Sequence, residues 1–214
     1  MRWAAPRVRP FHFQREVFRA PKQIHPRIVR ITHWVNAAAM TVMIMSSWQI
    51  HNAYPTLPFR FPMAVTLGGW LGGATQWHFA AMWLLVANGL GYLIYGLASG
   101  RLRRKLLPLS GGAVLADVKA ALTGSLRHDD LTAYNAVQKL LYLAVLAAGV
   151  LAVLTGIAIW KPVQFGWLTF LFGDFDAARL IHFAAMTAIV LFLAVHIPMA
   201  LLVPKSIRAM IRGR

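Results

Sequence analysis

The sequence predicts an all-α membrane protein, a bundle of four transmembrane helices with both termini on the cytoplasmic side. Hydrophobic residues make up 58% of the 214-residue chain and charged residues only 13%. Soluble domains average about 45–50% hydrophobic residues and about 25% charged residues. Four apolar runs reach the length of about 20 residues that spans a lipid core. Lysines and arginines alternate between dense and sparse blocks around these runs, which is typical of multi-span proteins.

The predicted spans cover residues 31–50, 79–97, 140–160 and 180–202. Backbone polar groups inside lipid must be hydrogen-bonded within their own segment, so these separate, long runs are expected to form helices. Prolines and glycines mark an irregular first connection (Pro55, Pro58, Pro62, Gly68, Gly69, Gly72 and Gly73). In the longest connection, 99–139, the mildly amphipathic stretch Val114–Leu122 is expected to lie on the membrane surface. Residues 1–214 are expected to form a single domain.

The distribution of lysine and arginine predicts the orientation. Eight lie in residues 1–30, seven in residues 99–139 and four after Val203, whereas the other two connections carry Arg60, Lys161 and Arg179. Because basic residues concentrate on the cytoplasmic side, both termini and the basic segment 1–30 are predicted to face the cytoplasm. The basic blocks flank the apolar runs. The net charge of +16 therefore indicates contact with lipid headgroups and not with nucleic acid.

The chain contains no cysteine. This excludes disulfides, iron–sulfur clusters, thiolate-ligated haem and covalent attachment of a c-type haem. No Ser/His/Asp or Cys/His arrangement indicates hydrolysis, so no catalytic residue is assigned.

The histidines carry the functional signal. His33, His182 and His196 lie within predicted spans, where an ionisable residue is costly and usually functional. His78 and His51 lie at the outer boundaries. His182 and His196 are 14 residues apart, which puts them on nearly the same helix face, about 21 Å apart along the axis. That spacing suits two metal sites stacked across a lipid core of about 30 Å.

The depth of each histidine selects its partner. His33 and His196 fall at the cytoplasmic level, and His78 and His182 at the periplasmic level. Two opposed imidazoles on facing helices can ligate a six-coordinate haem iron, so the sequence predicts two haem sites. Zinc fits less well, because structural zinc usually involves cysteine and catalytic zinc needs ligands that converge at one depth. His51 shares a helix face with His33 and is the alternative to His78 as the outer ligand.

Four basic residues beside the spans could neutralise haem propionates: Arg27, Arg30, Lys139 and Arg179. For each of them singly, a solvated or lipid-facing role is the commoner one.

Four segments of the chain resemble the bacterial cytochrome b561 and nickel–iron hydrogenase b-type cytochrome family, which includes the gamma subunits of formate dehydrogenase and thiosulfate reductase. They are RITHWVNAAAMTVMIMSSWQI, WHFAAMWLLVANGLGYLIYG, YNAVQKLLYLAVLAAGVLAVLTGIAIWKP and ARLIHFAAMTAIVLFLAVHIPMAL. The resemblance covers residues 24–210. It implies four helices in a bacterial inner membrane, two haems b ligated by His33, His78, His182 and His196, and quinone chemistry at one side. The quinone site is then expected near the inner haem, around His33, Asn36 and His196. In the small cytochromes that partner a molybdopterin oxidoreductase, the position of His51 is usually aromatic, so a local role for His51, such as a proton path, stays open.

The favoured function is an electron-transfer subunit, not a stand-alone enzyme. It would connect the quinone pool with a periplasmic catalytic partner, either a molybdopterin oxidoreductase or a hydrogenase-like protein. One alternative is a self-sufficient superoxide:quinone oxidoreductase, disfavoured by the few outer cations. Another is a haem-free membrane anchor or a transporter. A transporter would show broken helices in a repeated pattern, which the sequence lacks.

Overall fold

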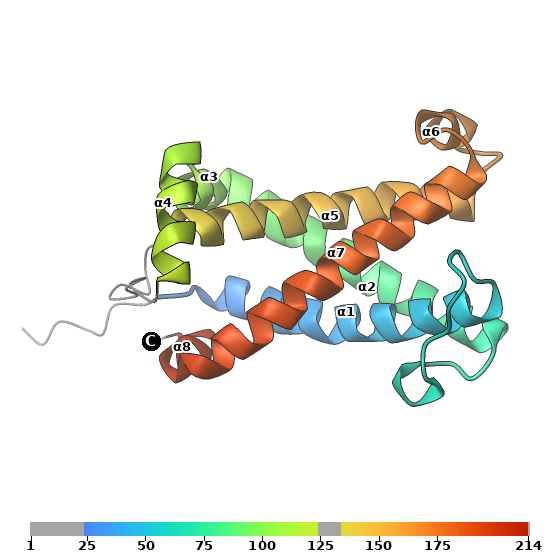
Figure 1. The fold of residues 1–214 in the computed structure, drawn as a ribbon, viewed down its shortest axis with the longest axis horizontal. Coiled ribbons are helices and arrows are strands. Elements are labelled where there is room, and N and C mark those ends of the chain that lie inside the picture. The colour runs from blue at the N-terminus through green and yellow to red at the C-terminus, as the bar shows by residue number, and fades with distance from the viewer. Residues whose placement is uncertain (1–23, 124–133, 214) are drawn as a thin grey trace, which may run out of the picture.

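A computed structural model describes residues 24–123 and 134–213, and over these residues the chain is helical without strands (Figure 1). Four helices are long and apolar enough to cross a membrane: α1 (Arg27–Ala53), α2 (Leu71–Ala98), α5 (Ala136–Trp160) and α7 (Phe175–Leu202). The prediction of an all-α protein with four transmembrane helices is confirmed. Most of the basic N-terminal segment, together with His12 and His128, lies outside the described residues.

Shorter helices lie in the connections: η1 (Met63–Val65), α3 (Arg101–Leu106), α4 (Gly111–Leu122), α6 (Gly166–Leu171) and α8 (Pro204–Arg212). The predicted surface stretch Val114–Leu122 falls within α4. The long connection between the second and third spans is therefore structured on both sides of the undescribed residues 124–133.

The transmembrane helices extend past the predicted spans, most of all at the start of α2. That helix begins at Leu71, eight residues before the predicted span, because a helix can continue where headgroups and water replace the lipid core. The assignment of Gly72 and Gly73 to the loop was wrong. A side chain at Gly73 would meet the carbonyl oxygen of Gly68, and one at Gly72 would meet the indole of Trp70. The tight turn before α2 thus requires glycine inside its first turn.

The four long helices form two hairpins. α1 packs along α2, and α5 packs along α7. Figure 1 shows the two ends of the bundle: α3, α4, α8 and both described chain ends gather at one end, and the loop 54–70 and α6 lie at the other. We call these the basic end and the loop end. Between these ends, the two hairpins are linked by the histidine pairs described below.

At the basic end, α8 is tied to the start of α1. Three hydrogen bonds make this connection: Ile24 N to Gly213 O (2.9 Å), Arg30 Nη1 to Ile211 O (2.8 Å) and Trp34 Nε1 to Met210 O (3.4 Å). Carbonyls at the end of a helix have no partner within the helix, and here α1 and its preceding residues supply the donors. The C-terminal segment is thereby linked to the first hairpin.

The start of α5 is capped twice. Asn135 and Gln138 form a reciprocal capping box, which satisfies two backbone N–H groups at the helix start. The carboxylate of Asp117 in α4 accepts a further bond from the Ala136 N–H at 2.6 Å. α4 is therefore held against the beginning of the third transmembrane helix.

Burial within the chain is sparse, as expected where lipid is the solvent. Large apolar side chains such as Trp83, Leu97 and Leu191 are 61–71% exposed on the transmembrane helices. Against this apolar background, the described residues include four buried polar side chains: Ser46, Gln49, His51 and Thr155. Ser46 and Thr155 contact histidines that are described below, and His51 is itself a histidine.

Candidate functional site

The first histidine pair joins the two hairpins near the basic end. His33 lies six residues after the start of α1, and His196 lies six residues before the end of α7. Their ring centroids are 6.2 Å apart with an angle of 63° between the planes. His196 stacks on Phe192 one turn earlier at 5.3 Å, and His33 meets the edge of Trp34.

The second pair joins the hairpins nearer the loop end. His78 and His182 each lie seven residues after the start of their helices, α2 and α7. Their ring centroids are 6.4 Å apart, with 65° between the planes. The Nδ1 atom of His78 is 3.1 Å from Ser46 Oγ, and that of His182 is 3.0 Å from Thr155 Oγ1. The structure thus brings together the histidines that the sequence predicted as two pairs.

Ser46 and Thr155 were not found from the sequence. Both side chains have 0% exposure, yet each contacts a histidine on the neighbouring helix of its own hairpin. A hydroxyl in an apolar span usually bonds to its own helix backbone. The sequence alone therefore offers no reason to assign either residue to a site.

Both pairs fit an iron held between two imidazoles. An imidazole nitrogen binds a first-row metal at about 2 Å, which puts the ring centroid about 3 Å from the metal, so two opposed ligands have centroids about 6 Å apart. The two observed separations, 6.2 and 6.4 Å, match that geometry. Across the described parts of the chain, no cluster of three or more histidine, cysteine or acidic residues is present, whereas a zinc site needs at least three protein ligands. Each pair therefore offers two imidazoles, the donor set of a haem iron with two histidine ligands.

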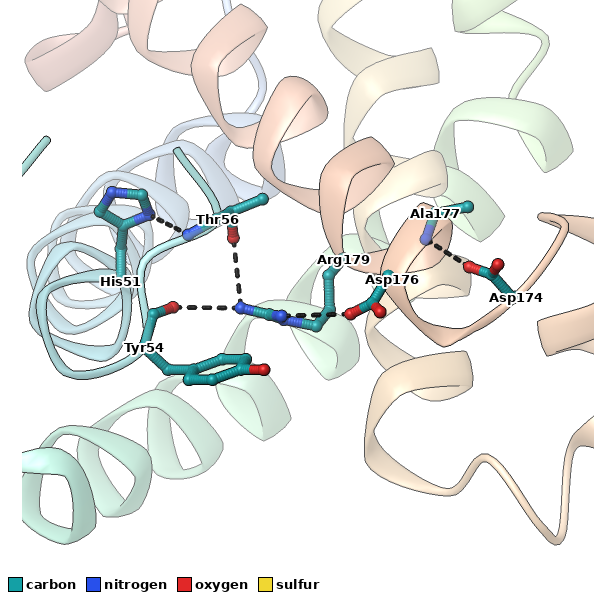
Figure 2. Close-up of polar contacts among 7 residues, drawn as sticks. All are labelled: His51, Tyr54, Thr56, Asp174, Asp176, Ala177 and Arg179. Atoms are coloured by element: carbon teal, nitrogen blue, oxygen red, sulfur yellow. Dashed lines mark hydrogen bonds and ion pairs between the residues drawn. The ribbon is translucent and has the colours of Figure 1, made fainter. Parts of the chain in front are cut away.

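His51 belongs to neither pair and lies in the last turn of α1, at the loop end. Its Nδ1 accepts the Thr56 N–H at 3.3 Å (Figure 2), and its Nε2 is 3.1 Å from the Phe59 carbonyl oxygen. The ring packs among Phe59, Phe61 and Phe183 and is 4% exposed. Because both nitrogens are engaged with backbone, the geometry favours His78 over His51 as the partner of His182.

Arg179 links the loop end of α7 to the segment after α1. Figure 2 shows its guanidinium between the Tyr54 carbonyl oxygen (3.1 Å), the Thr56 hydroxyl (3.4 Å) and the Asp176 carboxylate (3.3 Å). It also lies 4.2 Å from the centroid of the Tyr54 ring. Arg179 therefore holds the two hairpins together one helical turn from His182. Its predicted role toward a haem propionate stays a prediction.

Two of the other predicted flanking residues, Arg30 and Lys139, also bond to backbone. Arg30 donates to the Ile211 carbonyl of α8, and Lys139 donates to the Pro108 carbonyl at 3.2 Å. Asn36, one turn after His33, lies 3.4 Å from Asn88 Nδ2, which also donates to the Thr32 carbonyl at 2.8 Å. Asn88 was not singled out in the sequence, and it joins α2 to the helix face that carries His33.

A further histidine, His25, lies just before α1 at the basic end. Burial, and then the positive charges of Arg101 and Lys105, lower its pKa to about 4. The imidazole of His25 is therefore neutral at neutral pH.

Comparisons with known proteins identify the family. The model of the family described as prokaryotic cytochrome b561 matches residues 24–213. A protein of Azospira oryzae named as the protein-methionine-sulfoxide reductase subunit YedZ1 is 51% identical over 190 residues, 89% of this chain and 96% of that protein. A protein of Cupriavidus necator named as a Ni/Fe-hydrogenase B-type cytochrome subunit is 26% identical over 185 residues, 79% of this chain and 74% of that protein. The family resemblance is confirmed: the chain belongs to the prokaryotic cytochrome b561 family of multi-pass bacterial membrane proteins that carry b-type haem.

Proposed function

We propose that this protein is a di-haem cytochrome that passes electrons across the bacterial inner membrane, between the quinone pool and a periplasmic catalytic subunit. The observation that carries the proposal is the geometry of the two histidine pairs. Each pair bridges the two hairpins, and each has the ring separation of two imidazoles that share one ion. Since family membership provides b-type haem, two pairs support two haems.

When bound, each haem supplies a one-electron carrier whose potential depends on its ligands and its burial. The chain places the two imidazoles of each pair with their ring centroids 6.2 and 6.4 Å apart. His182 and His196 lie on one helix, and 14 residues of helix correspond to about 21 Å. This spacing distributes the two carriers over most of a lipid core of about 30 Å.

The relative of 51% identity supports a partner that reduces protein-bound methionine sulfoxide. That reaction consumes two electrons and two protons and yields methionine and water. A quinol releases two electrons and two protons on oxidation to quinone, so the stoichiometry is balanced by one quinol for each sulfoxide. The electrons would pass singly along the two histidine-held haems, from the basic end to the loop end.

The relative of 26% identity supports a second arrangement, in which a hydrogenase-like partner delivers electrons toward quinone. A self-sufficient superoxide:quinone oxidoreductase ranks lower, because it would need a cationic funnel at the loop end. Arg179 is engaged with Tyr54 and Asp176, and Lys161 lies over the Trp160 ring at 5.1 Å.

The ligand assignment is tested by haem content and optical spectra of the purified protein and of single histidine variants. We expect two b-type haems per chain. His78→Ala and His182→Ala should lose the same haem, and His33→Ala and His196→Ala the other. His51→Ala is the matched control and should retain both. A variant set in which His51→Ala loses the loop-end haem, or in which His182→Ala and His196→Ala both retain two haems, would refute the assignment.

The same variants test the direction in which electrons pass between the two haems. A quinol should reduce both haems of the parent protein. In His196→Ala it should leave the remaining loop-end haem oxidised, because the entry point at the basic end is missing. Equal rates of reduction in His196→Ala and in the parent protein would place the quinone site at the loop end instead.

A further inference from the structure

The same arrangement of a hydroxyl and a histidine occurs once in each hairpin. In the first hairpin, Ser46 of α1 lies 3.1 Å from Nδ1 of His78 in α2. In the second, Thr155 of α5 lies 3.0 Å from Nδ1 of His182 in α7. Both contacts involve the loop-end pair. Each of its two imidazoles therefore lies within hydrogen-bond distance of a hydroxyl on the neighbouring helix of its own hairpin.

The direction of these hydrogen bonds follows from the proton that each hydroxyl carries. Ser46 Oγ is 2.7 Å from the Val42 carbonyl oxygen, and Thr155 Oγ1 is 2.7 Å from the Leu151 carbonyl oxygen. A hydroxyl has a single proton. Since that proton is donated to the carbonyl four residues earlier, the lone pairs of the oxygen are left to accept from the histidine Nδ1–H.

This bond selects one form of the imidazole. A neutral histidine with its proton on Nδ1 presents Nε2 as the nitrogen that can bind a metal. The partner of the non-ligating nitrogen fixes the orientation of the ring and increases the basicity of the ligand. Both effects are strongest where water is excluded, and the side chains of Ser46 and Thr155 have 0% exposure.

The backbone beside Thr155 is also shaped to the ring. A Cβ atom at Gly156 would lie 3.3 Å from Cε1 of His182, so glycine lets the imidazole approach α5 closely enough to reach the Thr155 hydroxyl. The basic-end pair is held by different contacts: His196 stacks on Phe192 and His33 meets Trp34. The two pairs therefore differ in the groups that contact their rings.

We propose that Ser46 and Thr155 are positioning residues for the loop-end haem, and that their bonds to the Nδ1–H groups of His78 and His182 lower the reduction potential of that haem. A more basic imidazole stabilises the ferric state, which gives the direction of the shift. The inference rests on the proposed function, because it takes the two histidines as haem ligands.

The test measures both midpoint potentials by redox titration of the complete protein. Thr155→Val keeps the shape of the side chain and removes the hydroxyl. Thr155→Ser keeps the hydroxyl and removes the methyl group. Thr187→Val is the matched control, because Thr187 lies on α7 between the two histidines and its hydroxyl donates to the Phe183 carbonyl of the same helix at 2.9 Å. For His78, the variant is Ser46→Ala combined with Ser47→Ala, since Ser47 Oγ is also within 3.4 Å of Nδ1.

In Thr155→Val and in the double serine variant, we expect the loop-end potential to rise. The ratio of ferrous to ferric haem at that site, at a fixed ambient potential, should increase by up to about tenfold, with a changed low-spin EPR signal. The basic-end potential should not move. Thr155→Ser should restore the parent potential, and Thr187→Val should keep it.

The outcomes separate this inference from the function on which it rests. If His78→Ala and His182→Ala each remove the loop-end haem, but neither hydroxyl variant changes its potential or EPR signal, the positioning role is wrong and the function stands. If Thr155→Val loses the haem, Thr155→Ser decides: retention at the parent potential supports the role of the hydroxyl, and equal loss overturns it. If the histidine variants retain both haems, the ligand assignment itself fails.

Discussion

At the scale of single residues, the histidines differ in what satisfies their ring nitrogens. His78 and His182 have hydroxyl partners and face each other. His51 is bonded to backbone on both sides of its ring, which suits a residue that closes a loop. His25 is held neutral by burial and by nearby positive charge. Because a buried polar group needs a partner or must stay uncharged, these environments indicate a separate role for each histidine.

The pKa of His25 leads to a prediction of pH dependence. Its folded-state pKa of about 4 lies below the ordinary value of 6.5, so the unfolded chain binds a proton below about pH 6.5 that the folded chain does not bind. The stability of the folded protein should therefore fall as the pH drops from about 6.5 toward 4. His25→Asn should reduce this fall, as measured by thermal unfolding in detergent across that range. The parent and the variant should have equal slopes above about pH 7, where His25 is neutral in both states. Equal slopes below pH 6 as well would contradict the prediction.

At the scale of secondary-structure elements, the two hairpins are joined at both ends and in between. The bonds from α1 to α8 close the basic end, Arg179 closes the loop end, and the histidine pairs lie between them. Apolar association contributes little to helix packing when lipid is the solvent, so polar bonds and close packing carry more of the specificity. The position of the histidines across the interface therefore depends on a small number of polar residues.

Arg179 provides the test of this idea. Arg179→Lys keeps the positive charge but loses the planar group that donates to Tyr54 and Thr56 and lies over the Tyr54 ring. We expect a loss of about 1–2 kcal/mol of stability, with the loop-end haem released before the basic-end haem on heating.

Asp176→Asn is the control for the ion pair of Arg179. The Asp176 side chain is 82% exposed, so this change should cost less than about 1 kcal/mol. Thermal unfolding followed by haem absorbance measures both variants. If the two variants lose the same stability, the bonds to the Tyr54 segment do not brace the hairpins.

At the scale of the whole molecule, the chain has two unlike ends. Nineteen of its 22 lysines and arginines lie in residues 1–30, in residues 99–139 or after residue 203, and the described parts of these segments gather at the basic end (Figure 1). The loop end is formed by aromatic and apolar segments that include α6. This asymmetry predicts that the basic end faces the cytoplasm.

The absence of cysteine from the sequence allows a clean test of orientation. Val163, 87% exposed at the loop end, and the exposed Gly111 at the start of α4 can each be replaced by cysteine. In spheroplasts, a membrane-impermeant thiol reagent should label Val163→Cys, and should label Gly111→Cys only after the membrane is opened. The reverse pattern would place the basic end outside, and with it the proposed quinone side.

The fold and part of the site follow from local properties of the sequence. The length and apolarity of four runs predict four helices, because lipid leaves the backbone no other partner. The 14-residue spacing of His182 and His196 predicts two sites on one helix face. The ends of the helices were harder to predict from the sequence. The early start of α2 depends on how Trp70 and the backbone of Gly68 pack over its first turn, and the sequence pattern of a span does not contain those contacts.

By itself, then, the sequence determined the class of fold, the transmembrane helices and the histidines at two matched depths. Only the tertiary structure decided which helices pair as hairpins and that His78, and not His51, lies opposite His182. It also decided that Ser46 and Thr155 reach the rings of that pair. The physical reason is that depth along a helix axis is set by local chain geometry. The side chain that a histidine meets depends instead on the rotation of each helix about its axis, which is settled by contacts between residues distant in the sequence.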